Sequence, residues 1–109
     1  MTNEMKNIWD SQQAQQLVLV LSEIKKDSVM QDFLRDVLTE KEIIEISARL
    51  EAAKLLSSKE KYTTISEQTK LSSRTIARIS EWLQNGTKGY ASAISIIEKH
   101  HKHIPPARQ

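Results

Sequence analysis

Hydrophobic residues recur along most of the chain at intervals of three or four positions, a spacing that predicts α-helices. In the first segment, about residues 8–25, Leu17, Leu21 and Ile24 follow this spacing, and two valines between them widen the apolar face. A helix that is apolar over so much of its circumference does not face water. We therefore expect this helix to be central in the fold or to pack against another chain.

Two further helices are predicted before residue 57. Ser28 is a good N-cap for a short amphipathic helix that ends near Leu38. Thr39 and Glu42 then have the spacing of a capping box, which predicts a helix from about this point to Leu56. A polar loop of residues 57–61 follows.

The segment of residues 62–83 has the pattern of a helix-turn-helix. A short helix over about 63–69 and a second over about 73–83 are joined by three residues, and Ser72 is the natural N-cap of the second helix. Ser66 is small where the two helices need to approach. The positions expected to be buried are Ile65, Leu71, Ile76 and Ile79.

The chain ends with one more predicted helix. Asn85 and Gly86 mark the end of the preceding helix, where a residue with positive φ can form the cap. The last helix runs from about residue 88 to 99. The pattern as a whole predicts an all-α fold of about six helices, with a single helical domain over residues 1–104 and a C-terminal tail over 105–109.

Composition narrows the choice of function. The 109 residues include 2 Gly, 2 Pro and no Cys, which disfavours β-rich folds and excludes thiolate metal sites and cysteine nucleophiles. The longest apolar run, residues 17–21, is far shorter than the roughly 20 residues of a membrane helix. No basic segment leads into an apolar segment at the N-terminus, so we expect a cytoplasmic protein without a membrane partner.

Charge is distributed unevenly along the chain. Residues 1–56 carry 7 Lys and Arg against 10 Asp and Glu, a net charge of −3, whereas residues 57–109 carry 9 against 4, a net charge of +5. The net charge of the second half permits a nucleic-acid partner. A solvated surface with chance clustering of charge is the alternative.

The start of the second helix of the helix-turn-helix carries the candidate DNA-reading residues. This turn enters the major groove in such motifs, where Arg74 can contact guanine and Ser72, Ser73 and Thr75 can reach base edges or phosphates. Phosphate contacts are expected from Lys59, Lys61, Thr63, Thr64, Lys70 and Arg78. An ordinary helical hairpin with a polar face is the alternative. Lys70 stands where the turn usually has glycine, and a non-glycine residue with positive φ costs about 1 kcal/mol.

Other chemistry has little support in the sequence. His100, His101 and His103 have no carboxylate or thiol close by, so we expect surface histidines and no metal site. There is no glycine-rich phosphate loop and no pairing of a nucleophile with a base, so an enzyme is not expected. Trp82 is expected to pack in the core or against another subunit.

Several segments together resemble the tryptophan repressor superfamily, most closely the repressor-like branch common in Gram-positive bacteria. The resemblance covers about residues 28–100. It rests on residues 38–42 (Leu-Thr-Glu-Lys-Glu), 47–51 (Ser-Ala-Arg-Leu-Glu), 48–56 (Ala-Arg-Leu-Glu-Ala-Ala-Lys-Leu-Leu), 62–69 (Tyr-Thr-Thr-Ile-Ser-Glu-Gln-Thr), 72–78 (Ser-Ser-Arg-Thr-Ile-Ala-Arg) and 85–90 (Asn-Gly-Thr-Lys-Gly-Tyr). It implies six helices in an intertwined homodimer, which binds a roughly palindromic operator in double-stranded DNA.

The resemblance also implies a site for a small-molecule corepressor. In tryptophan repressors two arginines and a threonine hold this ligand, and Arg49, Arg78 and Thr39 are similar to them in position. Ile79 replaces the small residue that follows the second arginine and would project toward the space that a tryptophan ring needs. Tryptophan is therefore disfavoured as the effector, and Arg49 can instead be a surface residue paired with Glu45.

The sequence thus predicts a dimeric, sequence-specific DNA-binding transcriptional regulator, and a repressor is the expected kind. The alternative is a helical dimeric protein-interaction module that does not bind DNA. The DNA-binding end of a recombinase is a third reading, but 109 residues leave no room for its catalytic domain.

Overall fold

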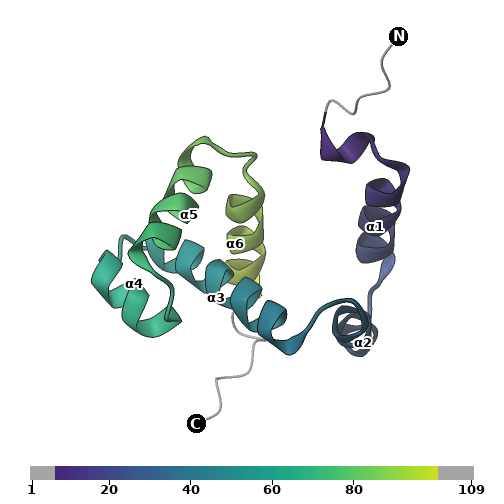
Figure 1. The fold of residues 1–109 in the computed structure, drawn as a ribbon, viewed down its shortest axis with the longest axis horizontal. Helices are drawn as coiled ribbons and strands as arrows, with labels where there is room; N and C mark the ends of the chain where they lie inside the picture. The colour runs from purple at the N-terminus through teal and green to yellow at the C-terminus, as the bar shows by residue number, and fades with distance from the viewer. Residues whose placement is uncertain (1–6, 101–109) are drawn as a thin grey trace. The chain divides into compact units, whose positions relative to one another are not determined.

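The computed structural model describes residues 7–100, and this part of the chain is helical throughout with short connections (Figure 1). The helices are η1 (Ile8–Asp10), α1 (Gln12–Glu23), α2 (Asp27–Val37), α3 (Glu40–Ser57), α4 (Tyr62–Thr69), α5 (Ser73–Asn85) and α6 (Gly89–Lys99). The expected all-α fold with six α-helices is confirmed. The predicted tail of residues 105–109 lies outside the described residues.

The chain forms two compact units, with the boundary between Glu40 and Lys41. The N-terminal unit contains η1, α1 and α2, and the C-terminal unit contains nearly all of α3 together with α4, α5 and α6. Because the boundary falls at the first residue of α3, the helix-turn-helix belongs to the C-terminal unit alone.

The first predicted helix is interrupted at Ser11. Asn7 caps the short helix η1, since its side chain accepts a hydrogen bond from the Trp9 amide at 2.8 Å. Ser11 then adopts an extended conformation and caps α1 by accepting from the amide of Ala14. Two capping residues four positions apart therefore divide what the apolar spacing predicts as one helix.

The second helix begins before its predicted cap. Lys26 is the N-cap residue of α2 and gives no side-chain cap hydrogen bond, so the expectation that Ser28 caps the helix is wrong. Asp27 lies in the first turn of α2, where a carboxylate is stabilised by the positive end of the helix dipole. This interaction accounts for a start one residue before Ser28.

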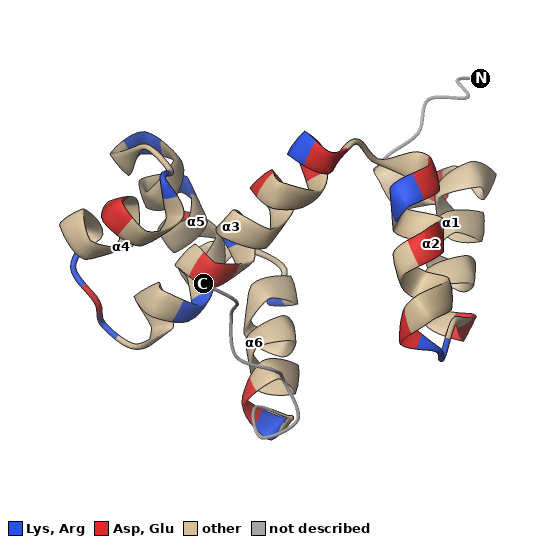
Figure 2. Cartoon of the chain, turned by 90° about the horizontal axis from the view of Figure 1, so that it is seen from below, with Lys and Arg blue, Asp and Glu red and all other residues tan. Residues whose placement is uncertain are grey.

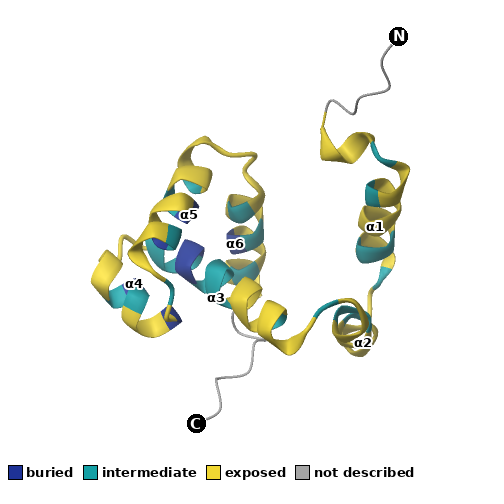
Figure 3. Cartoon of the chain, in the orientation of Figure 1, coloured by how far each residue is buried: buried dark blue, intermediate teal, exposed yellow. Residues whose placement is uncertain are grey.

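No side chain of α1 or α2 is buried (Figure 3). Three consecutive residues of α1, Leu17, Val18 and Leu19, are 45%, 47% and 58% exposed. Val29 and Val37 of α2, which the sequence places on its apolar face, are also about half exposed. The apolar surface of the N-terminal unit is thus much larger than one copy of this unit covers.

The hydrophobic core lies in the C-terminal unit, where α3, α4, α5 and α6 each contribute buried residues (Figure 3). Two small residues of α3 let the neighbouring helices approach closely. The prediction that Ile65, Ile76 and Ile79 are buried is confirmed, and Leu71 packs against them while partly exposed. The complete core is Ala52, Ala53, Ile65, Ile76, Ile79 and Ile94.

The connection between α5 and α6 differs from the expected one. Gly86 ends α5 with φ −89° and ψ −154°, so the cap with positive φ predicted at Asn85–Gly86 is wrong. The residue with positive φ is Lys88, at 74°. Gly86 is required for another reason, because a Cβ atom there would lie 2.5 Å from the carbonyl oxygen of Trp82.

Within residues 7–100, no helix has the length and apolar character that crossing a membrane requires.

Candidate nucleic-acid interface and neighbouring groove

The turn between α4 and α5 is fixed by hydrogen bonds from side chains on both of its sides. The hydroxyl of Ser66 donates to the carbonyl of Leu71 at 2.8 Å. The hydroxyl of Thr69 donates to the carbonyl of Ile65 at 2.7 Å and accepts from the Leu71 amide at 3.3 Å. The bond between Thr69 and Ile65 is buried and the two bonds to Leu71 are partly buried, so water competes little with them and they hold the turn in place.

Lys70 caps α4 in the left-handed conformation, with φ 64° and ψ 14°. Its amide donates to the carbonyl of Ser66 at 2.8 Å, which ends the helix. The expectation that a lysine takes the usual glycine position with positive φ is therefore confirmed. The result is a cationic side chain exposed at the turn itself.

The first turn of α5 presents fewer free polar groups than the sequence predicts. The Ser72 hydroxyl caps the helix by accepting from the Thr75 amide at 3.2 Å, and it lies 3.2 Å from the Thr75 hydroxyl. The cap predicted at Ser72 is thus confirmed, but both hydroxyls take part in it. Ser73 and Arg74 are exposed, and their side chains make no hydrogen bond within the described part of the chain.

Five cationic residues lie on or beside the helix-turn-helix, and all are exposed. None of them forms an ion pair with any residue between 7 and 100. Lys59 and Lys61 flank Glu60 in the loop that leads into α4 (Figure 2). Their charge is consequently available to an external anion. The five are Lys59, Lys61, Lys70, Arg74 and Arg78.

A polar hollow of about 390 Å³ lies between α4 and the start of α5. It brings together Thr63 and Ser73, two of the predicted DNA-contacting residues. Thr64 does not line this hollow and is half-buried. Glu67 lines it and was not predicted, although it is the only acidic residue in the sequence between positions 62 and 80. The complete lining is Tyr62, Thr63, Ser66, Glu67 and Ser73.

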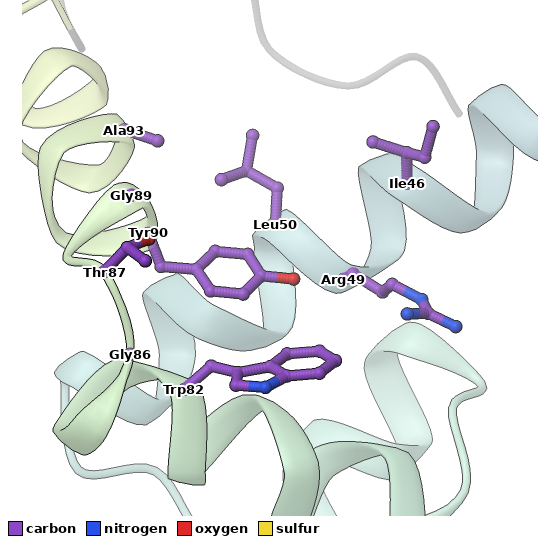
Figure 4. A pocket seen from close by; sticks show the side chains of 9 residues that line it. All are labelled: Ile46, Arg49, Leu50, Trp82, Gly86, Thr87, Gly89, Tyr90 and Ala93. Carbon is purple, nitrogen blue, oxygen red and sulfur yellow. The ribbon is translucent and has the colours of Figure 1, made fainter. Parts of the chain in front are cut away.

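A second, larger groove of about 670 Å³ lies between α3, α5 and the start of α6 (Figure 4). Its surface is mostly apolar. The rings of Trp82 from α5 and Tyr90 from α6 are its largest side chains (Figure 4). Trp82 is 44% exposed, so it does not pack in the core of one chain, and the alternative that it packs against another subunit stays a prediction. The lining residues are Ile46, Arg49, Leu50, Trp82, Gly86, Thr87, Gly89, Tyr90 and Ala93.

The predicted effector residues have different surroundings. Arg49 lines the groove, and its guanidinium is paired with Glu45 one helical turn earlier at 2.7 Å, which confirms the surface pairing. Arg78 is exposed on α5 and does not line the groove. Thr39 precedes α3 and belongs to the N-terminal unit.

Ile79 does not fill the groove. Its side chain is fully buried in the core and is absent from the groove lining, so the expectation that Ile79 projects toward a ligand ring is wrong. The physical reason is that Ile79 lies one helical turn after Ile76, on the face of α5 that packs against the other core helices. Trp82 is the α5 side chain that lines the groove instead.

The described residues contain no group of His, Asp or Glu arranged to hold a metal ion. Of the three clustered histidines, His100 is described and exposed. His101 and His103 lie outside the described residues.

Comparison with known proteins gives a consistent picture. The model of the family described as Trp repressor protein matches residues 12–98. The crystal structure of a TrpR-like protein from Eubacterium eligens is similar with a TM-score of 0.76 and 33% identity, over 81% of this chain and 91% of that one. A "putative Trp repressor" from Staphylococcus aureus gives a TM-score of 0.76 and 25% identity, over 87% of this chain and 96% of that one. No curated protein matches the sequence significantly.

Proposed function

Because the chain belongs to the Trp repressor protein family, we propose that it is a sequence-specific DNA-binding regulator, in the first place a repressor. It acts as a homodimer in the cytoplasm, through the helix-turn-helix formed by α4 and α5. Two-fold symmetry places two α5 helices about one DNA turn apart, so the operator is roughly palindromic.

The observation that carries the proposal is the set of unpaired cations around the exposed start of α5. Within residues 7–100 these five cations have no ion partner, and a DNA-binding surface needs such cations for phosphates. Ser73 and Arg74 are the residues whose side chains remain available to read base edges. Phosphates are bound by Lys59, Lys61, Thr63, Thr64, Lys70 and Arg78, with Ser72 and Thr75 as further contacts at the helix start.

The homodimer is supported by apolar surface that one chain leaves uncovered. Leu17, Val18 and Leu19 on α1 and Ile44 and Ile46 on α3 are each between 45% and 67% exposed. Exposed apolar residues that are grouped in this way, on each of the two helices taken by itself, mark an interface in a folded protein. A short chain with a small core also gains stability when two copies share apolar surface.

Substitution of Arg74 by alanine tests the DNA-reading role. We expect Arg74→Ala to weaken binding to the preferred operator by about 1–3 kcal/mol and to relax the preference at one base pair per half-site. Arg78→Ala is the matched control, since it removes the same charge from a residue assigned to phosphate. It should weaken binding to all sequences about equally. Titrations against the selected operator and against random duplex DNA measure both effects.

Two measurements together would contradict the proposed DNA-binding function. If selection from random duplexes enriches no sequence, and if binding does not fall steeply with rising salt, the chain is not a DNA-binding regulator. The exposed apolar surface would then favour a dimeric protein-interaction module. If Arg74→Ala lowers affinity equally for all duplexes, Arg74 contacts phosphate and does not read bases.

We propose that an effector, if one regulates the protein, binds the groove beside Arg49. The family resemblance implies Thr39 and Arg78 as further effector residues, and neither of them lines this groove. We do not extend the proposal to tryptophan, because the indole of Trp82 already lines this groove. Titration calorimetry with tryptophan is the test. Saturable heat that is lost in Arg49→Ala would make tryptophan the effector after all.

A further inference from the structure

The hollow between α4 and α5 contains one negative charge, which is unexpected on a surface that binds the negatively charged DNA backbone. Glu67 lines it together with Thr63 and Ser73, which come from the two ends of the proposed interface. The side chain is exposed and makes no hydrogen bond or ion pair with other described residues. Between positions 62 and 80 it is the only acid, against three bases. Its carboxylate thus remains available beside the residues proposed to contact DNA.

The chemistry of a carboxylate limits what it can bind there. An ionised carboxylate only accepts hydrogen bonds, so it has no favourable contact with phosphate oxygens. In the major groove the available donors are the exocyclic amino groups of cytosine and adenine, and acidic side chains pair with the cytosine N4 amino group. The same carboxylate repels a phosphate that is displaced into the hollow. It therefore favours one docking register over the others.

We propose that Glu67 is a specificity-determining residue that accepts a hydrogen bond from a cytosine amino group at the edge of each half-site and disfavours docking registers that bring a phosphate against its own carboxylate. The inference rests on the proposed function, since it requires the helix-turn-helix to bind DNA. The role of Glu67 differs from that of Arg74 in two ways: Glu67 lies on α4 and not on α5, and its side chain is negatively charged. Arg74 raises the affinity for DNA that has its preferred base pair. Glu67 lowers the affinity for most DNA sequences and leaves unchanged the affinity for the sequence that has cytosine at its position.

The test compares Glu67→Gln with Glu60→Gln. Both replacements keep the shape of the side chain and remove one negative charge, and both residues are exposed. Glu60 lies in the loop before α4 and does not line the hollow. Its neutralisation reports the general effect of charge near phosphates. For each protein, selection from random duplexes gives the preferred site, and mobility-shift titrations give affinities for that site, for versions with single base-pair changes, and for random DNA.

The expected result is a change of preference in one variant only. Glu67→Gln should bind random DNA more tightly. At one cytosine-containing base pair per half-site it should lose about tenfold discrimination between cytosine and adenine, because a carboxamide pairs with adenine N6 and N7. Glu60→Gln should raise affinity for all duplexes by a similar factor and leave the preferred site unchanged. Circular dichroism of both variants should match the parent protein, because neither side chain has a hydrogen-bond partner among residues 7–100.

Two results would overturn the inference. If Glu67→Gln raises the affinity for all duplexes as Glu60→Gln does, Glu67 acts only as a general repulsive charge. If Glu67→Gln binds every duplex like the parent protein, Glu67 lies outside the interface. The parent protein separates these results from failure of the proposed function. If the parent enriches no sequence, DNA recognition itself is absent and the role of Glu67 falls with it.

Discussion

The two units of the chain differ in where their apolar side chains lie. In the C-terminal unit, isoleucines from three helices and two alanines of α3 form a core that is almost fully shielded from water. In the N-terminal unit, α1 has the longest apolar run of the sequence, and three of its five residues are exposed while the other two are only half-buried. The number of apolar residues in a unit therefore does not determine whether that unit forms a hydrophobic core within one chain.

The difference shows which part of the stability one chain supplies by itself. Burial of a large aliphatic side chain contributes about 1.5–3 kcal/mol, and the C-terminal unit gains this from Ile65, Ile76 and Ile79 within one copy. The N-terminal unit has the same kind of residue but leaves it exposed. Its apolar residues can contribute only when a second surface covers them.

The largest expected effect comes from a truncation in the core. Ile76→Ala removes a fully buried side chain, so we expect the free energy of unfolding to fall by about 4 kcal/mol. The loss should be the same at low and high protein concentration, because the contacts lie within one chain. Chemical denaturation measures it, with the exposed Gln84→Ala as a control that stays within about 0.5 kcal/mol of the parent. If the loss of stability in Ile76→Ala depends on protein concentration, the core of the C-terminal unit is also stabilised by a second chain.

A charge on the exposed face of α1 should have the next largest effect. Leu19→Glu prevents burial of a leucine in each copy of the proposed dimer, so we expect dimerisation to weaken by about 3 kcal/mol. Sedimentation equilibrium measures the monomer–dimer constant. Gln12→Glu adds the same charge at an exposed polar position of the same helix and should change it little. Unchanged dimerisation in Leu19→Glu would mean that this face of α1 is not the interface.

The smallest effect concerns the turn of the C-terminal unit. Lys70→Gly relieves the left-handed conformation, so we expect the free energy of unfolding to rise by about 1 kcal/mol. The same variant should bind every DNA sequence more weakly, because it lacks one phosphate contact. Thermal melts and DNA titrations measure the two changes. A loss of stability would mean that the lysine side chain supports the turn through packing.

Local signals in the sequence located the helix-turn-helix well. The cap at Ser72, the turn over residues 70–72 and the buried face of α5 each depend on neighbours within a few positions, and each is confirmed. The left-handed Lys70 was predictable because the pattern around it demands a tight turn. Position along a helix is sufficient information for features of this kind.

Features that depend on packing between distant helices were not predictable in the same way. Ile79 was placed beside a ligand by resemblance, but the side on which its side chain lies is decided by the other core helices. Trp82 was expected in a core or interface, and its place in the groove requires α3, α5 and the start of α6 to come together. The hollow around Glu67 likewise requires α4 and α5 in their final arrangement.

The two tryptophans of the sequence fall one in each unit. Trp9 follows the capped start of η1 in the N-terminal unit, and Trp82 lines the groove of the C-terminal unit. They are 54% and 44% exposed, so the emission of each should respond when another molecule covers it. A protein with Trp9→Phe or with Trp82→Phe would therefore contain a single tryptophan, whose emission can be excited selectively above the tyrosine absorption band. Association through the N-terminal unit and occupation of the groove can then be followed as separate optical signals in the same chain.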